Sequence, residues 1–592
     1  MRNTSQDKTD PRKWALARFP WLWKFVEKVP SLRRFVNAQA INGAIAEIPP
    51  RPNPLSCGWD YTTWEGVTNR RWSGRHLPPS PPPPDLPLPE RVAQTLFGRK
   101  NGVMIESEKS TLLFPYFAQW FTDGFLAADP IDRRRNYSNH EIDLSQLYGL
   151  RPETTDLIRE HRNGRLRSQV LNGGEFPPFL FDKDVAPDAL WDFKMEYRRK
   201  RQTYEDYADV GAQHMQVVLQ AAHGSEHRPA EVNPYRKEPP LSFPAYSPDQ
   251  PPHLAFNELR LTDSARMFHQ WHRDWFAFAN ERANSTPAFV MMNVLMLREH
   301  NRIAALLSEE YRHDPKWNKS EEYFDERVFQ TTRNILTVVV MKIVVEEYIN
   351  HITPYHFKLF VDPPSFSKPA KWKWTNWMAV EFNMLYRWHS MIPSDLRLGN
   401  RVVPSLETLW NTKLIVDEGL APMFNYASQQ AAGRIGAKNT WDWLVKMAEA
   451  PTIQMGRDAE VASYNDYREL CGMPHVDAFN QISGDESIQA ALQELYGTPE
   501  RVEFYAGLFA EDLRPNSALA PLVGTMVGID AFSQALTNPL LSPRIYQPET
   551  FSPLGWKMIQ EAQSIEALVR RNTPEYKGTY DIHMTRSGWQ PS

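Results

Sequence analysis

Nine consecutive residues decide how the rest of the chain is interpreted: Glu381-Phe382-Asn383-Met384-Leu385-Tyr386-Arg387-Trp388-His389. They place a tyrosine three residues before a histidine in an apolar, aromatic run. On a helix, side chains at this spacing share one face, about 5–6 Å apart at Cβ. We therefore expect a redox-capable phenol, Tyr386, beside a potential iron ligand, His389. Because a lone histidine on an apolar helix is more often a hydrogen-bonded core residue, this interpretation needs support from elsewhere in the chain.

A second apolar run provides some of that support: Phe117-Ala118-Gln119-Trp120-Phe121-Thr122-Asp123-Gly124-Phe125. Gln119 and Asp123 are four positions apart, so they share a helix face. Buried polar side chains need partners, and a cavity with bound water or peroxide above an iron would supply them. The alternative is an ordinary buried amide and an acid at a helix end.

The composition indicates a globular protein with one large core and appendages. The 592 residues show no sharp compositional break, and 42% of them are hydrophobic and 12% aromatic. The 67 basic and 71 acidic residues nearly balance, which gives no sign of a nucleic-acid partner. Cys57 and Cys471 are the only cysteines, which excludes a disulfide framework and a thiolate metal cluster.

Residues 1–50 interleave aromatic and basic side chains, as interfacial helices do. No run reaches the roughly 20 apolar residues of a spanning helix, and the first residues lack a secretion signal. We expect amphipathic helices on a membrane surface, and hence a monotopic, peripherally membrane-associated and non-secreted protein. The alternative is a helix pair docked on the protein's own core. The residues concerned are Trp14, Phe19, Trp21, Trp23, Phe25, Val29, Leu32 and Phe35, with Arg12, Lys13, Arg18, Lys24, Lys28, Arg33 and Arg34.

The remaining organisation follows from proline content and helical periodicity. Residues 51–90 are proline-rich and predict a stiff linker that wraps the body. Residues 91–592 form the main domain, interrupted by a polar, proline-rich insertion at about 198–285. Apolar residues recur at helical spacing in 288–309, 326–350, 374–390 and 406–432, so we expect a mainly α body with little sheet.

Six separated segments occur in one order that resembles the cyclooxygenases, the prostaglandin endoperoxide synthases. These belong to the haem peroxidase superfamily, which also holds the plant α-dioxygenases. The similarity runs from about residue 51 to 555. The segments are Phe117 to Phe125, Ile142 to Gly149, Leu297 to Arg302, Glu346 to Tyr348 with Tyr355, Glu381 to His389, and Ala432 to Gly436.

The resemblance implies an all-α haem-peroxidase fold, haem b as cofactor, and a dioxygenase that uses a fatty acid and O2. His389 falls on the proximal ligand of the haem iron, and Trp388 on an aromatic residue beside it. Gln119 and Asp123 fall on the opposite, distal side of the haem. The cyclooxygenases' membrane-binding helices match the amphipathic start of this chain, and their dimers imply a possible homodimer here.

The substrate side of the resemblance is carried by tyrosines. Tyr386 falls on the tyrosine whose radical abstracts hydrogen from the fatty acid, and Tyr348 on its hydrogen-bond partner. Tyr355 matches the tyrosine at the channel mouth that helps an arginine hold the substrate carboxylate. Arg51 is the best candidate for that arginine.

Three positions depart from the cyclooxygenase pattern. Asp123 stands where the distal histidine moves a proton between peroxide oxygens, so we expect weak peroxidase activity. Ala531 occupies the position of the serine that aspirin modifies, which argues against bicyclic endoperoxide chemistry but not against simple oxygenation. Arg387 replaces a histidine and changes the charge beside Tyr386.

Two alternatives remain open at this point. One is a haem protein that acts on preformed lipid hydroperoxides or on a non-lipid substrate. The other is a catalytically silent, membrane-associated binding protein that keeps only the fold.

Overall fold

The structure is a computed structural model that describes residues 15–46, 70–128, 133–180, 274–366, 376–561 and 563–590. Arg51 and most of the expected insertion, residues 198–273, lie outside these ranges. The described part is predominantly helical, as expected from the sequence. Its strands form three small antiparallel pairs: β1 (Glu106–Thr111) with β6 (Ala431–Gly433), β2 (Gln169–Leu171) with β3 (Gly174–Phe176), and β4 (Asp395–Leu398) with β5 (Arg401–Pro404).

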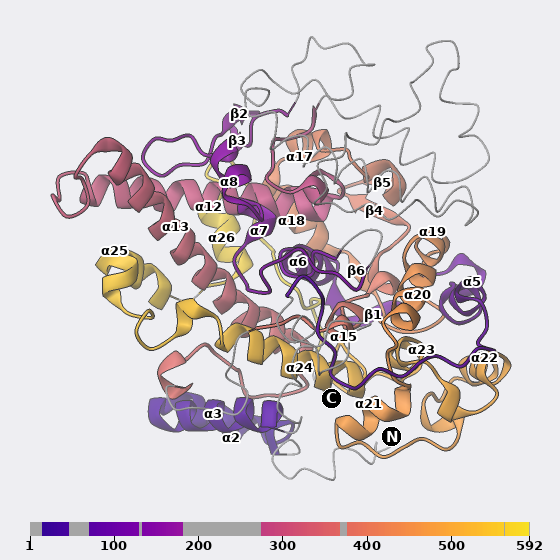
Figure 1. The fold of residues 1–592 in the computed structure, drawn as a ribbon. Helices are drawn as coiled ribbons and strands as arrows, with labels where there is room; N and C mark the ends of the chain where they lie inside the picture. The colour runs from indigo at the N-terminus through magenta and orange to yellow at the C-terminus, as the bar shows by residue number, and fades with distance from the viewer. Residues whose placement is uncertain are drawn as a thin grey trace, which may run out of the picture.

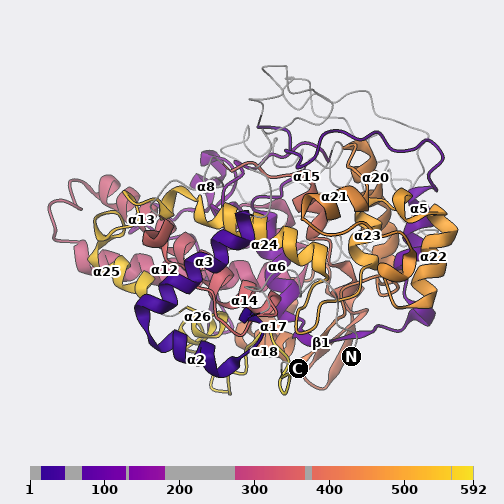
Figure 2. The ribbon, with the colours of Figure 1, turned by 90° about the horizontal axis from the view of Figure 1, so that it is seen from below.

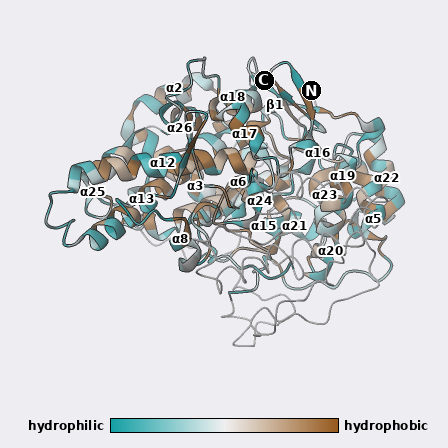
Figure 3. Ribbon diagram, turned by 90° about the horizontal axis from the view of Figure 1, so that it is seen from above, coloured by the Kyte–Doolittle hydropathy of each residue, from teal (hydrophilic) through white to brown (hydrophobic). Residues whose placement is uncertain are grey.

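Three apolar helices pack together in the middle of the molecule (Figure 1). They are α6 (Leu113–Asp123), α12 (Pro287–Tyr311) and α13 (Glu321–Ile343), and α12 contacts both of the others. Hydroxyl caps begin the two long helices, because Thr286 accepts from the Phe289 amide and Ser320 from the Tyr323 amide. Figure 3 shows hydrophobic residues gathered on these central helices. Every residue of α6 except Gln119 is buried, which accounts for a helix that is apolar on nearly every face.

Among the described residues, one helical run, Glu321–Ile352, is long and apolar enough to cross a membrane by length and composition. It consists of α13, the π-helical η6 (Val344–Ile349) and α14 (Asn350–Ile352). Within its most apolar window, 78% is buried inside the protein. The Lys342 ammonium inside this run donates to the carbonyls of Ile559 and Glu561, at 2.6 and 2.7 Å. The run therefore has the burial of a core helix.

The helices expected at 288–309 and 326–350 are confirmed, but two others are shorter than periodicity indicated. The helix expected at 374–390 is only α15 (Val380–Leu385). The one expected at 406–432 is divided into α16 (Ser405–Thr408), α17 (Lys413–Glu418) and α18 (Leu420–Gln429). Gly419, with φ at 87°, separates the last two, since a left-handed residue ends a helix.

The N-terminal helices α2 (Pro20–Lys28) and α3 (Pro30–Ala46) each start with a proline and lie along one edge of the body (Figure 2). The segment 356–360 holds them, because the Lys358 amide donates to Glu27 at 3.0 Å and Asn37 donates to the Phe360 carbonyl at 3.0 Å. Helix α3 also packs on α24 (Pro521–Leu536). The pair is thus docked on the body, yet its outer face is rich in exposed aromatic side chains.

Residues 70–90 run along the body in extended conformation, bridged at Gly74 to Ala379 and at Trp72 to Arg135. The shorter elements between this segment and α17 are α5 (Pro89–Val92), η2 (Ala93–Phe97), η3 (Lys100–Gly102), α7 (Ser145–Tyr148), α8 (Pro152–Ile158), η5 (Glu281–Asn284), η7 (Pro363–Phe366) and η8 (His389–Met391). The C-terminal third adds α19 (Asp442–Leu444), η9 (Val445–Glu449), α20 (Ala450–Asp458), α21 (Tyr464–Leu470), η10 (Phe479–Gln481), α22 (Glu486–Tyr496), η11 (Pro499–Arg501), α23 (Phe504–Ala510), η12 (Pro539–Leu541), α25 (Pro548–Gln560) and α26 (Ile565–Asn572).

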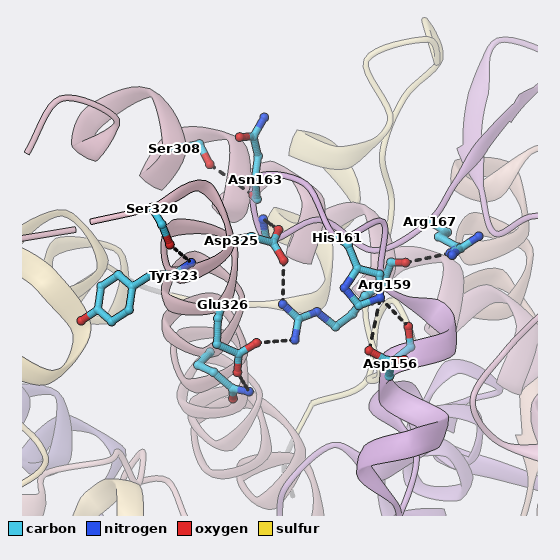
Figure 4. A network of polar contacts seen from close by, with 12 residues as sticks. Asp156, Arg159, His161, Asn163, Arg167, Ser308, Ser320, Tyr323, Asp325 and Glu326 are labelled. Carbon is cyan, nitrogen blue, oxygen red and sulfur yellow. Dashed lines mark hydrogen bonds and ion pairs between the residues drawn. The ribbon is translucent and has the colours of Figure 1, made fainter. Parts of the chain in front are cut away.

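A polar network fastens the loop after α8 to the side of α13 (Figure 4). The Arg159 guanidinium pairs with Asp325 at 2.8 Å and with Glu326, and it lies 4.1 Å from the centre of the Phe329 ring. The second Asp325 oxygen accepts from the Gly164 amide at 2.6 Å. The network therefore fixes the loop at both its beginning and its end.

His300, from one of the six segments, is a structural residue of the same region. Its Nδ1 accepts from the Tyr148 hydroxyl at 2.8 Å, and its Nε2 donates to the Gly164 carbonyl at 2.8 Å. Burial lowers the pKa of His300 to about 3. The imidazole is therefore neutral in the folded protein over the whole physiological range.

Loss of this histidine should flatten the acid dependence of stability. Between about pH 3 and 6.5 the unfolded chain binds a proton that folded His300 refuses, so stability falls as pH is lowered through this window, by up to about 1.4 kcal/mol per unit. We expect His300→Gln to lack this part of the slope in urea unfolding from pH 6.5 to 4. Replacement of the exposed His313 by Gln is the control and should keep it. If stability changes with pH equally in the unaltered protein and in both variants, His300 is not the source of this slope.

Candidate functional site

The turn between Tyr386 and His389 is the centre of the site, and it is not helical. Helix α15 ends at Leu385, and the Leu385 carbonyl accepts from the Trp388 indole at 2.7 Å. In a continued helix that carbonyl would accept from the amide of His389. The expectation that Tyr386 and His389 share one helix face is therefore wrong. Tyr386 follows the helix end, and His389 begins the short η8.

An aromatic cluster surrounds Tyr386 and joins three elements. The ring of Tyr386 stacks on Trp388 with centroids 5.0 Å apart, and Trp388 stacks on Phe114 of α6 at 5.2 Å. Tyr348 of η6 stacks on the same phenylalanine at 5.3 Å. The structure thus brings together three of the four aromatic residues that the resemblance singled out, Tyr348, Tyr386 and Trp388.

The two tyrosine hydroxyls influence each other inside this cluster. Burial is the main cause that raises the pKa of both Tyr348 and Tyr386, and each phenol shifts the pKa of the other. Neither hydroxyl has a well-aligned hydrogen-bond partner in the described ranges. Both phenols are therefore protonated at neutral pH, and the two hydroxyls lie close enough for a contact between them to affect the pKa of each.

His389 faces a buried carboxylate on one side. Its Nδ1 lies 3.2 Å from Glu449 Oε1, although off the direction of a well-aligned hydrogen bond. The other imidazole nitrogen, Nε2, has no hydrogen-bond partner among the described residues. A histidine held at Nδ1 with Nε2 available has the arrangement of a metal ligand.

Gln119 and Asp123 lie on α6, as predicted, but differ in their contacts. Asp123 is buried, with Oδ1 paired to the Arg282 guanidinium at 2.8 Å and Oδ2 accepting from the Asn280 amide at 3.0 Å. Burial raises the pKa of Asp123, and these two partners offset part of the rise. The Gln119 side chain is half-buried and makes no hydrogen bond in the part of the chain that the structure describes.

Arg387 adds positive charge beside the turn. Burial is the main cause that lowers its pKa to about 10, and Arg133 and Arg282 add repulsion. Its Nε is buried without a hydrogen-bond partner within the described ranges. Three guanidinium groups thus lie near one another, although Arg282 is paired with Asp123 and the Glu449 charge offsets part of their repulsion.

The substrate-side residues are placed by α24 and by the segment after α14. Ala531 is buried on α24, which packs on α15, and the charge of the neighbouring Asp530 raises the pKa of Tyr386. Tyr355 is half-buried next to the segment 356–360 that holds the N-terminal helices. Arg51 lies outside the described residues, so its place beside Tyr355 stays a prediction.

Comparison with known proteins decides the family. Residues 247–584, more than half of the chain, match the family model of the animal haem peroxidases. The chain belongs to this family. Prostaglandin G/H synthase 1 of Mus musculus is 27% identical over 586 residues, covering 97% of this chain and 82% of the relative. Prostaglandin G/H synthase 2 of Bos taurus is 25% identical over 594 residues, covering 97% and 83%.

Solved structures show the same fold at much lower identity. The fatty acid alpha-dioxygenase of Arabidopsis thaliana superimposes with a TM-score of 0.62 at 14% identity, covering 96% of this chain and 88% of that one. Peroxidase A of Dictyostelium discoideum gives 0.57 at 15% identity, covering 90% and 100%. The all-α haem-peroxidase fold expected from the sequence is confirmed.

Membership makes this animal haem peroxidase a haem-dependent oxidoreductase, and the residues fit the cofactor. His389 offers a free Nε2 for the iron, and the Arg387 region suits carboxylates such as the haem propionates. Within the described ranges, no three His, Cys, Asp or Glu side chains gather into a metal-ion cluster. A porphyrin iron with one histidine ligand is consistent with that arrangement.

Sequence reasoning missed three residues of the site: Asn280, Arg282 and Glu449. The first two lie in the stretch assigned to the proline-rich insertion, yet residues 274–285 belong to the body, where Phe276 is fully buried and bridged to Phe179. The apolar stretch from Trp275 to Ala279 was the signal that this part belongs to the body. Glu449 lies 60 positions from His389, and no spacing rule connects the two.

The Asp123–Arg282 pair can be tested by unfolding. Arg282→Leu leaves the carboxylate buried without its cation, so we expect a loss of about 1–3 kcal/mol in the free energy of unfolding at mildly alkaline pH. Adding Asp123→Asn should recover part of that loss, because an amide carries no charge to desolvate. Urea denaturation measures both.

The matched control is the exposed pair Arg91–Glu494, at 3.1 Å. Arg91→Leu should cost less than about 1 kcal/mol, as surface ion pairs do. If Arg282→Leu costs no more than the control, or if the double variant is no more stable than Arg282→Leu alone, the pair does not stabilise the site.

Proposed function

We propose that this haem peroxidase is a fatty-acid dioxygenase in which a Tyr386 radical abstracts hydrogen from an unsaturated acyl chain. One observation carries the proposal: Tyr386 is a half-buried phenol with a buried, protonated hydroxyl, stacked on Trp388 and placed one short turn before His389. The similarity to prostaglandin G/H synthases and the fold of fatty acid alpha-dioxygenases support the substrate class.

The residues divide the task between holding the cofactor and handling the substrate. His389 would hold the iron through Nε2, with Trp388 beside it, and Gln119 and Asp123 of α6 would face the peroxide. When bound and activated by a peroxide, the haem supplies a one-electron oxidant. Burial suits the neighbouring phenol to this role, because water is excluded from the radical.

Tyr386 then acts by exchange of hydrogen atoms. The phenol loses one electron and its proton once, on activation. The phenoxyl radical takes a hydrogen atom from the acyl chain, which restores the phenol and leaves a carbon radical that adds O2. The resulting peroxyl radical takes the hydrogen atom back from Tyr386, giving a hydroperoxide and regenerating the phenoxyl for the next turnover.

The acyl chain is proposed to lie along α24, past Ala531. This helix contacts both α15, next to Tyr386, and α3 at the edge of the molecule. Tyr348 packs against the radical tyrosine from the other side, and Tyr355 with Arg51 would hold the substrate carboxylate. An alanine at 531 favours a hydroperoxide product over a bicyclic endoperoxide.

The contacts of Asp123 support the expectation that peroxidase turnover is weak. A distal acid–base catalyst must pass a proton between peroxide oxygens. Both carboxylate oxygens of Asp123 already have partners in Arg282 and Asn280. Because one activation serves many cycles at Tyr386, slow peroxide chemistry is compatible with oxygenation.

Replacement of Tyr386 by phenylalanine tests the radical. Phenylalanine keeps the stacking ring but has no phenolic hydrogen, so we expect oxygen uptake with unsaturated fatty acid to fall at least about 100-fold, the lower range for loss of a positioned catalytic group. The Soret band of the haem should be unchanged. Oxygen electrode measurements and absorption spectra provide the two readouts, and retained uptake would eliminate the radical scheme.

His389→Ala is the companion variant, and it should lose the Soret band and oxygen uptake together. Parallel incubation with a fatty-acid hydroperoxide separates the alternatives. A hydroperoxide-converting enzyme would consume that substrate without taking up gas from free fatty acid. A silent binding protein would bind no haem at all.

The exposed face of α2 and α3 supports a second proposal, peripheral attachment to a lipid surface. Trp21, Phe25 and Phe35 are 70%, 59% and 61% exposed, in a region that also displays Lys24 and Arg34 at its surface. Aromatic and cationic side chains on one helical surface suit the boundary between acyl chains and anionic headgroups. Homodimerisation stays a prediction.

Vesicle pelleting tests the attachment. Replacing Trp21, Phe25 and Phe35 together by serine removes three large apolar groups that would enter the lipid, so we expect binding to mixed neutral and anionic phospholipid vesicles to weaken at least about tenfold. Leu88→Ser, at an equally exposed apolar position outside α2 and α3, should bind as the unaltered protein does. Unchanged binding of the triple variant would refute attachment through this face.

A further inference from the structure

Glu449 accepts two hydrogen bonds and also lies beside His389. Its Oε1 accepts from the Thr440 hydroxyl at 2.8 Å and lies 3.2 Å from His389 Nδ1. Its Oε2 accepts from the Tyr505 hydroxyl. The carboxylate is almost fully buried, so its partners replace the water that it lost on folding.

The position of Glu449 in the fold is unusual as well. It is the last residue of η9, a π-helical turn between α19 and α20. A π-turn of this kind re-aims the side chains that follow an α-helix and occurs often at functional sites. Here it brings a carboxylate against the imidazole of the proposed iron ligand.

A purely structural role would require only that Glu449 satisfy Thr440 and Tyr505. That explanation leaves His389 Nδ1 without a partner, because this buried nitrogen has no other acceptor within the described residues. The 3.2 Å between Nδ1 and Oε1 is within the range of a hydrogen bond. The contact therefore has a consequence for His389 and not only for the packing of η9.

We propose that Glu449 is a positioning residue that accepts a hydrogen bond from His389 Nδ1 and thereby sets the donor strength of Nε2 toward the haem iron. This inference rests on the proposed ligation of the iron by His389. A carboxylate acceptor fixes the tautomer in which Nε2 carries the lone pair and makes the imidazole a stronger electron donor. The stronger donor stabilises ferric over ferrous iron.

Tyr505 and Thr440 moderate this effect. Each donates a hydrogen bond to Glu449 and so withdraws negative charge from the oxygen that faces His389. Burial and the Glu449 charge raise the pKa of Tyr505 well above its usual value, so this phenol remains a donor. Removal of the phenol hydroxyl should act in the opposite direction to removal of the carboxylate charge.

The test uses the haem-loaded, full-length protein and two readouts. In Glu449→Gln we expect the midpoint potential of the ferric/ferrous couple to shift to a more positive value, and the iron–histidine stretching frequency of the ferrous form, measured by resonance Raman, to fall. In Tyr505→Phe both should move the other way. Each variant thereby checks the other if one of them folds poorly.

Glu511→Gln is the matched control, because Glu511 is also buried and also accepts from a tyrosine, Tyr464, at 3.0 Å, but does not contact His389. It should leave both readouts unchanged. If Glu449→Gln changes the potential while the stretching frequency stays constant, Glu449 acts only as a remote charge and the inference is overturned. Values equal to the unaltered protein in both Glu449 and Tyr505 variants overturn it as well.

Failure of the underlying function would look different. If His389→Ala keeps the same iron–histidine stretching band as the unaltered protein, then another residue holds the iron and both proposals fall. If that band disappears in His389→Ala while the Glu449 and Tyr505 variants are unaffected, ligation stands and only the role of Glu449 is rejected.

Discussion

One hydrogen bond shapes the site: the Trp388 indole donates to the Leu385 carbonyl and ends α15. In a helix that continued, the Leu385 carbonyl would instead accept from the backbone amide of His389. Because the helix stops, Tyr386 turns into the aromatic cluster of Trp388 and Phe114. His389 then starts a new short element whose imidazole faces Glu449. Tyr386 and His389 thus lie in different elements, on either side of this contact.

Much of this architecture could be predicted from the chain alone, because apolar periodicity reports burial directly. The long central helices were recognisable for that reason, and so was the shared helix face of Gln119 and Asp123. The same rule failed at residues 386–389, where a side-chain donor competes with the backbone. Sequence spacing does not show which of the two a carbonyl will accept.

Contacts between distant segments were beyond prediction for a different reason. Asn280 and Arg282 approach Asp123 across more than 150 positions, and Glu449 approaches His389 across 60. Their residue types alone do not distinguish them from surface polar residues. Their partners are identified only in the folded structure, where each buried charge needs a compensating group.

Buried carboxylates also link the site to several other elements of the fold. Asp123 has Arg282 and Asn280, and Glu449 has Tyr505 and Thr440, so each desolvated carboxylate is matched by donors from other elements. Arg387 differs, since it lies near the cations Arg133 and Arg282 as well as near the anionic Glu449.

The uncovered aromatic side chains of α2 and α3 have a consequence for anyone handling the purified protein. In plain buffer, Trp21, Phe25 and Phe35 present an apolar area that water disfavours. Two molecules can hide that area by meeting face to face, so an apparent pair seen in gel filtration without detergent reports surface stickiness. Only an assembly that persists in mild micelles would report a specific contact between copies.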